Sequence, residues 1–146
     1  MKDDWLPEPG LRLPPPLTLR LYEGAEVLFS SEKRWLHPLF DLEAFFIQGG
    51  QDPARTRLLD RITGRAAALL MARLGIPELH TWILSRRAIP ILAQHGIRYR
   101  CGELVDKVAC VTEDLFAEIQ DLEAAWALLQ ERRGACIQSS RKKGQS

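Results

Sequence analysis

Short apolar runs alternate with helix-like segments through the middle of the chain, and this alternation constrains the fold more than any other feature. Leu58-Leu59 predicts a short buried strand, and the segment from Gly64 to Leu74, which Gly75 ends, predicts a helix. The same reading predicts strands at Leu79–Leu84 and Ile97–Cys101, with a helix at Arg86–Gln94 between them. Strands that alternate with helices form crossover units, so we expect a mainly parallel sheet in this region.

The segments on either side complete the predicted architecture. Leu17, Leu19 and Leu21 alternate with polar residues, and Glu26–Ser30 follows a glycine-containing turn, which together predict an antiparallel hairpin. A helix is expected from His37-Pro38 to Gly49-Gly50, and Asp121 is expected to cap a last helix. The predicted fold class is α/β: a three-layer α/β/α sandwich whose mixed sheet of about five strands opens with the hairpin.

The chain of 146 residues divides into three predicted regions. Residues 1–16 hold five of the nine prolines and predict an extended N-terminal arm. Residues 17–133 form the predicted domain, and residues 134–146 are a polar, basic tail that we expect to be disordered.

Charge and hydropathy restrict the classes of partner. Lys and Arg number 20 against 19 Asp and Glu, so the net charge of +1 predicts no nucleic acid as partner. No apolar stretch reaches the roughly 20 residues that cross a bilayer, and we expect no membrane partner. The acidic, proline-containing N-terminus does not resemble a signal peptide, so the predicted location is the cytoplasm. The sequence leaves the oligomeric state open, a homo-oligomer included.

Motifs for metals and cofactors are missing from the sequence. The three histidines (His37, His80 and His95) do not form a metal-binding pattern, and three cysteines do not make a disulfide framework. There is no glycine-rich nucleotide loop and no Gly-x-Ser-x-Gly element. We therefore predict no metal and no cofactor, and a zinc-dependent deaminase activity is not expected.

The polar cluster from Asp60 to Arg65 is the first candidate site. If it lies at a helix start, unpaired N–H groups and the helix dipole favour an anion there. Arg61 and Arg65 could contact a phosphate, Asp60 and Thr63 could bind hydroxyl or amino groups, and Gly64 permits close approach. The alternative is an ordinary helix start, with Asp60 or Thr63 as the cap and both arginines facing solvent. Ser85 is a further ligand-binding candidate, although a role as a helix N-cap would need no other explanation.

Cys110 and Glu113 form the second candidate. A cysteine near the start of a helix tends to have a lowered pKa and could act as a nucleophile or redox thiol, with Glu113 assisting. The alternative is a thiol packed in the core.

Several segments resemble one known family. Asp60-Arg61-Ile62-x-Gly64-Arg65-Ala66-Ala67-Ala68 is similar to an Asp-Lys-Val-x-Gly-Lys-Ala-Ala-Ala segment of domain-of-unknown-function family 1893. Leu84-Ser85-x-x-Ala88-x-x-x-Leu92 and Cys110-x-x-Glu113 resemble two more of its motifs in the same order. The resemblance covers roughly Leu17 to Arg133, but Val111 replaces a proline of the family, and the loop before Cys110 is short.

The resemblance implies a bacterial protein with a cytidine-deaminase-like fold. In zinc deaminases, metal ligands occupy two helix starts that face one pocket, and here Asp60–Arg65 and Cys110–Glu113 stand in their place. Three functions follow as hypotheses. The first is a metal-free module, regulatory or accessory, that binds a small anionic or nucleotide-like ligand. The others are a thiol-dependent enzyme that uses Cys110 and a structural or interaction protein with an empty pocket.

Overall fold

The computed structural model describes residues 13–34, 36–108, 116 and 119–132. Five strands form one sheet in the order β2-β1-β3-β4-β5. Their bounds are β1 Leu19–Glu23, β2 Glu26–Ser31, β3 Arg57–Thr63, β4 Glu78–Ser85 and β5 Arg98–Val105. β1 pairs antiparallel with both β2 and β3, whereas β3, β4 and β5 are parallel. The predicted mixed sheet of about five strands, opening with an antiparallel hairpin, is confirmed.

The helices follow the expected start and stop signals. They are α1 (His37–Gly49), α2 (Arg65–Leu74), α3 (Ile89–Gln94) and a C-terminal helix at 122–132, with short 3-10 turns η1 (Pro53–Arg55) and η2 (Arg86–Ala88). Gly50 ends α1 with a left-handed φ of 68°, which glycine adopts without strain. Asp121 accepts a hydrogen bond from the Ala124 amide at 3.3 Å and so caps the C-terminal helix as predicted.

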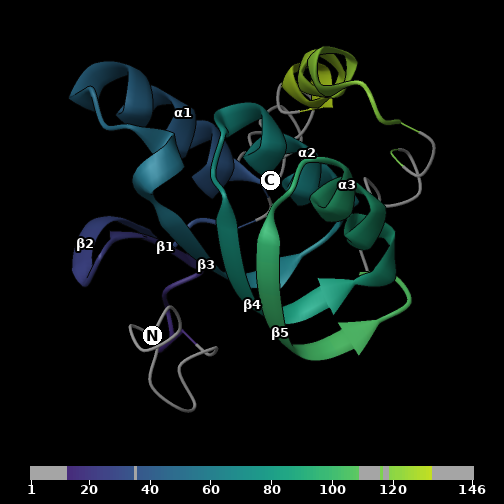
Figure 1. Ribbon diagram of the computed structural model, residues 1–146, viewed down its shortest axis with the longest axis horizontal. Helices are drawn as coiled ribbons and strands as arrows, with labels where there is room; N and C mark the ends of the chain where they lie inside the picture. The colour runs from purple at the N-terminus through teal and green to yellow at the C-terminus, as the bar shows by residue number, and fades with distance from the viewer. Residues whose placement is uncertain (1–12, 35, 109–115, 117–118, 133–146) are drawn as a thin grey trace, which may run out of the picture.

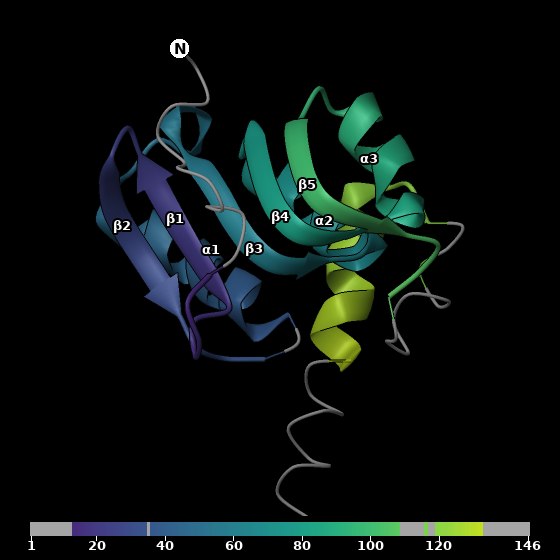
Figure 2. The ribbon, with the colours of Figure 1, turned by 90° about the horizontal axis from the view of Figure 1, so that it is seen from below.

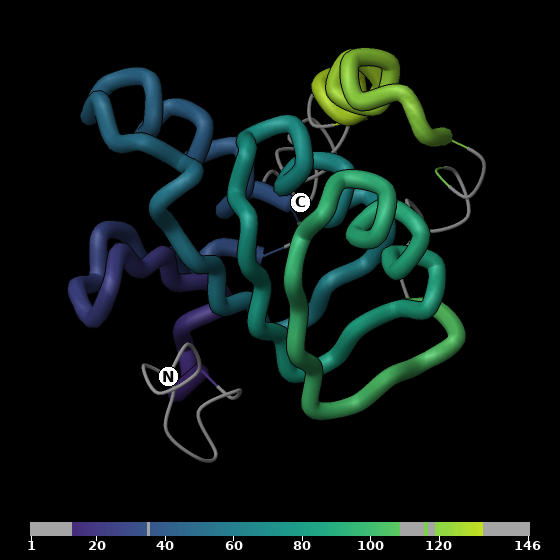
Figure 3. The backbone as a smooth tube through the Cα atoms, in the orientation of Figure 1, coloured from purple at the N-terminus to yellow at the C-terminus, as the bar shows by residue number. Residues whose placement is uncertain are grey.

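All of these helices lie on one face of the sheet (Figures 1 and 2). The chain crosses from β2 to β3, from β3 to β4 and from β4 to β5 in one direction along the sheet, as the trace in Figure 3 shows for the last two crossovers. Right-handed crossovers that advance in one direction place every connecting helix on the same side. The three-layer prediction is therefore wrong for the described residues, which form two layers, because none of their helices covers the opposite face.

One hydrophobic core fills the space between the sheet and the helices. Leu21, Leu58 and Leu79 from the sheet meet Leu42 of α1 and Leu69 of α2 in a single cluster. The C-terminal helix joins this layer through Trp126, whose ring lies 5.5 Å from that of Phe40 and 4.1 Å from the Arg73 guanidinium. None of the helices that the structure describes combines the length and the apolar character needed to cross a membrane.

Several element bounds differ from the prediction, and one difference changes the candidate site. β3 continues to Thr63, so Asp60, Arg61 and Thr63 belong to a strand and not to a helix start. The sequence did not indicate the full length of β3, because only Leu58 and Leu59 form an apolar run and the second half of the strand is largely polar. The predicted helix at Arg86–Gln94 is divided into η2 and α3, and β5 begins at Arg98 and extends to Val105.

The opposite face of the sheet receives the last residues of the predicted arm. Leu13 is buried, and the Arg61 guanidinium donates to the Leu17 carbonyl oxygen at 2.9 Å. A cavity of about 710 Å³ remains between Leu13-Pro14-Pro15 and the side chains of Arg61 and Trp82.

Candidate functional site

The candidate site lies at the edge of the sheet where β2, β3, β4 and β5 end. β2 is parallel to β3 because both are antiparallel to β1, so the carboxyl ends of all four strands share one edge. Ligands of open α/β sheets bind at this edge. A cavity of about 420 Å³, within the usual range for small ligands, opens there. It is lined by Pro15, Pro16, Thr18, Glu32, Lys33, Arg34, Pro38, Asp60, Arg61 and Ile62.

Asp60 is the most perturbed group at this cavity. Its side chain is buried, and burial raises the pKa of the carboxyl from 3.8 to about 7. The Thr63 hydroxyl lies 3.1 Å from Asp60 Oδ2, and the amides of Arg61 and Ile62 also donate to the carboxylate; these hydrogen bonds oppose the shift only in part. Asp60 therefore changes charge close to neutral pH.

Three cationic residues are among those that line the cavity. Arg61 lines it from β3, and Lys33 and Arg34 line it from the loop after β2. Lys33 is exposed and forms an ion pair with Asp41 at 2.7 Å. Glu32 and Asp60 are the carboxylates among the described lining residues, so these residues carry an excess of one positive charge when Asp60 is ionised and of two when it is protonated.

Lys33 and Arg34 were not predicted as site residues. In the sequence they form part of a polar run between a strand and a helix, where exposed charges are usual. Only the parallel relation of β2 and β3, which are separated by β1, brings this loop beside Asp60.

Arg65 is buried, whereas one of the two predictions for it was a solvent-facing position. It is 5% exposed, and its guanidinium donates to the backbone oxygens of Phe116 (2.8 Å), Ile119 (2.7 Å) and Arg87 (3.0 Å). Arg65 thus connects the start of α2 to η2 and to the segment before the C-terminal helix. It does not line the cavity, so we do not include it among the groups available to a ligand.

The remaining predicted residues of this region also have structural roles. Gly64 is the N-cap of α2, and no side chain caps this helix, so neither Asp60 nor Thr63 is its cap. Thr63 is buried between Asp60 and Thr81, with its hydroxyl oxygen 3.1 Å from each partner. Ser85 is buried and accepts a hydrogen bond from the Arg87 amide at 3.1 Å, which confirms the alternative of a cap.

The second candidate lies outside the described residues. Cys110 and Glu113 belong to residues 109–115, and their roles stay predictions. Among the residues that the structure does describe, no group of three His, Cys, Asp or Glu side chains could hold a metal ion.

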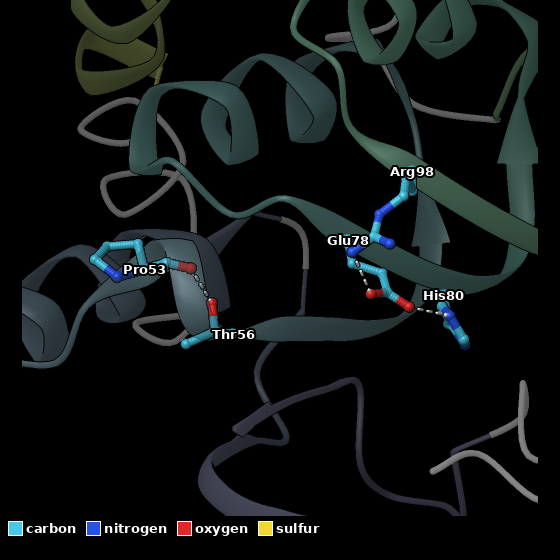
Figure 4. A network of polar contacts seen from close by, with 5 residues as sticks. All are labelled: Pro53, Thr56, Glu78, His80 and Arg98. Atoms are coloured by element: carbon cyan, nitrogen blue, oxygen red, sulfur yellow. Dashed lines mark hydrogen bonds and ion pairs between the residues drawn. The ribbon is translucent and has the colours of Figure 1, made fainter. Parts of the chain in front are cut away.

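A second polar network lies at the opposite edge of the sheet, where β4 and β5 begin (Figure 4). The buried Glu78 carboxylate accepts from Arg98 Nη2 and contacts His80 Nε2, each at 3.1 Å. His80 is 1% exposed, so its ring is buried beside this carboxylate. Close by, the Thr56 hydroxyl donates to the Pro53 oxygen at 2.7 Å before β3 begins. This network is separate from the cavity.

The chain matches a family model and a solved structure. The model of a family described as "Domain of unknown function (DUF1893)" matches residues 17–132. The crystal structure of a DUF1893 family protein (TM1506) from Thermotoga maritima superposes with a TM-score of 0.72 and 22% sequence identity, covering 80% of each chain. At this identity the second match shows the fold alone. No curated protein matches the chain.

Proposed function

Because the chain belongs to the DUF1893 family, a domain of unknown function, we propose a function from its own cavity: metal-free binding of a small anionic, nucleotide-like ligand. The observation that supports this proposal is the cavity at the carboxyl ends of the strands. Its lining includes Lys33, Arg34 and Arg61 together with the buried Asp60, and burial raises the pKa of Asp60 to about 7. Cationic side chains bind phosphate oxygens by charge-assisted hydrogen bonds, and a carboxyl group binds hydroxyl or amino groups. The cavity offers both kinds of contact.

The proposed role is regulatory or accessory. The described residues that line the cavity carry charged groups, one hydroxyl and apolar side chains, and none of these described residues is a histidine or a cysteine. Such a set binds and orients a ligand but supplies no nucleophile of the kind that Cys110 would provide. The cytidine-deaminase-like character that the family resemblance implies stays a prediction.

The protonation of Asp60 sets the expected pH dependence. Above pH 7 the ionised carboxylate repels an anion in the cavity, and below pH 7 the neutral carboxyl group does not. Anion affinity should therefore rise as the pH falls through 7. Sulfate is a suitable probe, because its charge is constant over this range while that of phosphate changes.

Thermal denaturation with sulfate, phosphate and nucleoside monophosphates tests the proposal. A ligand at about one hundred times its dissociation constant should stabilise the native protein by about 2.7 kcal/mol. The double variant Lys33→Ala, Arg34→Ala should lose at least about tenfold in affinity, the scale of one charged hydrogen bond. Asp60→Asn should remove the pH dependence of sulfate binding.

Arg86→Ala is the matched control. Arg86 is an exposed arginine paired with Asp106 and is not one of the residues that line the cavity, so this variant should bind like the native protein. The absence of stabilisation by any of these anions, or equal losses in the control and the double variant, would contradict the proposal.

A further inference from the structure

A second cavity adjoins the candidate site. Its volume is about 710 Å³, that of the candidate site is about 420 Å³, and small-molecule sites occupy roughly 300–1,000 Å³. The two cavities have three lining residues in common, Pro15, Arg61 and Ile62. A ligand that reaches past these three residues therefore occupies both cavities at once.

The linings of the two cavities differ in chemistry. The lining of the candidate site, here called the charged cavity, includes Glu32, Lys33, Arg34 and Asp60. The second cavity, here called the apolar cavity, is lined by Leu13, Pro14, Pro15, Arg61, Ile62, Trp82 and Ile83. Arg61 is the one charged residue in this described lining, and its guanidinium already donates to the Leu17 carbonyl oxygen at 2.9 Å. The apolar cavity thus suits a group that is bound by burial and not by hydrogen bonds.

Ile62 and Ile83 form a continuous apolar surface in this cavity. They are register partners in the parallel pair of β3 and β4, whose strands lie about 4.8 Å apart. Ile62 is 47% exposed, which is unusual for a large hydrophobic side chain among the described strand residues. Because a ligand that covers Ile62 removes this apolar surface from water, its burial favours an apolar group in the ligand.

The proline-containing segment before β1 lines both cavities and is held in place by hydrogen bonds. The carbonyl oxygen of Thr18 accepts from the Arg61 amide at 3.1 Å, and its hydroxyl donates to the Lys33 carbonyl oxygen at 2.6 Å. The Leu17 amide donates to the Pro14 oxygen at 3.0 Å and closes a turn. These bonds connect β3, the cationic loop and the proline segment, so the two cavities keep a constant separation.

We propose that the ligand of this site is an anion joined to an apolar ring, as in an aryl phosphate or aryl sulfate. The anionic group lies at Lys33 and Arg34, and the ring lies against Ile62 and Ile83. This assignment rests on the proposed function, because it needs the anion site, and it adds the chemical class of the rest of the ligand. A sugar in the apolar cavity would leave buried hydroxyl groups without partners, which lowers affinity.

Calorimetric titration at pH 6 with methyl, phenyl and 2-naphthyl sulfate tests the inference. All three esters carry a single negative charge at this pH, so differences in affinity report the uncharged part alone. Burial of about 60 Å² of apolar surface raises affinity about tenfold. The naphthyl ester should therefore bind at least about tenfold more tightly than the methyl ester, with the phenyl ester between them. Glucose 6-sulfate, whose ring is polar, should bind no more tightly than methyl sulfate.

A double variant and a matched control locate the ring. Ile62→Thr, Ile83→Thr keeps β-branched side chains, which suit strands, but makes the apolar surface polar. It should weaken naphthyl sulfate at least about fivefold and leave methyl sulfate unchanged. Val27→Thr, Ile47→Thr alters two residues that are 46% and 76% exposed and line neither cavity, so the ratio of the two affinities should stay native. Thermal melting verifies that each variant is folded.

The variant Lys33→Ala, Arg34→Ala tests whether the two cavities act together. It should weaken the methyl and naphthyl esters by the same factor, because the anionic group is common to both. Naphthyl sulfate binding that this variant does not change, or equally tight binding of uncharged 2-naphthol, would overturn the inference.

The titrations also separate this inference from the proposed function. Binding of methyl sulfate without any gain for the naphthyl ester would overturn the inference and leave anion binding intact. The absence of binding by sulfate and by every ester would overturn both. Equal losses of naphthyl affinity in the Ile62, Ile83 variant and its control would also contradict the placement of the ring. The comparison of esters uses the native protein, so it decides the inference without relying on the folding of a variant.

Discussion

The buried carboxyl group of Asp60 should make the stability of the protein depend on pH in an unusual direction. Its pKa is raised from 3.8 to about 7 in the folded state, chiefly because burial disfavours the ionised form. The folded protein therefore holds this proton more tightly than the unfolded chain. The contribution of Asp60 to stability is fully present below pH 4 and is lost as the pH rises towards and through 7.

The substitution Asp60→Asn isolates this effect. The asparagine is neutral at every pH, keeps the shape of the carboxyl group, and can still accept from the backbone amides, while Thr63 can rotate its hydroxyl to accept from the new amide. One pKa unit corresponds to about 1.4 kcal/mol, so the raised pKa costs the native protein on the order of 4 kcal/mol above pH 8. Between pH 5 and pH 7 the variant should gain about 2 kcal/mol relative to the native protein.

Urea unfolding of both proteins at pH 5, 6, 7 and 8 measures the difference directly. Asp106→Asn, at an exposed side chain, is the control and should change the free energy of unfolding by the same amount at each pH. Thr63→Val removes a hydrogen bond that lowers the Asp60 pKa, so the pKa of Asp60 in this variant should be higher still. The fall in the free energy of unfolding with rising pH should therefore continue to a higher pH in Thr63→Val than in the native protein. A difference between Asp60→Asn and the native protein that does not change from pH 5 to pH 8 would refute the reasoning.

Three further substitutions test the structural roles of single residues. Arg65→Ala should lower the free energy of unfolding by about 3 kcal/mol or more, measured by urea unfolding, because a buried guanidinium that serves three carbonyl oxygens is removed; an unchanged stability would show that these bonds do not form. Gly102→Ala should cost about 1–3 kcal/mol and shift the tryptophan fluorescence, because the new methyl group displaces Trp82; an unchanged spectrum would contradict this packing. Ser85→Ala should cost about 1 kcal/mol in thermal melting, through loss of the cap on Arg87, and should leave anion binding intact; lost binding would return Ser85 to the site.

The sequence determined the type and order of most elements. Glycine and proline marked the ends of α1 and α2, since these residues act through local backbone geometry. The alternation of leucines with polar residues predicted a strand at β1, and Asp121 predicted the start of the last helix. Each of these signals depends on a few neighbouring residues, so the sequence carries it without reference to the rest of the fold.

Other parts of the fold and the site depended on contacts between distant segments. The sequence placed Asp60 and Arg61 in a site, and the structure brings both to one cavity. It could not show that Arg65 is buried, because its partners Phe116 and Ile119 are more than fifty residues away. It also could not bring Lys33 and Arg34 to Asp60, since that requires the order of the strands.

The number of layers and the distribution of charge were decided by the tertiary structure alone. A helical segment between two strands looks the same in sequence whichever edge of the growing sheet the next strand joins. Here β3, β4 and β5 are added in one direction, and this order places all the described helices on one face. The same sheet brings Arg20, Arg57, Arg61, Arg98 and Arg100, which are far apart in the sequence, to the opposite face of the strands. A net charge is a sum over the chain, whereas an electrostatic surface depends on where each charge lies, and only the folded sheet sets those positions.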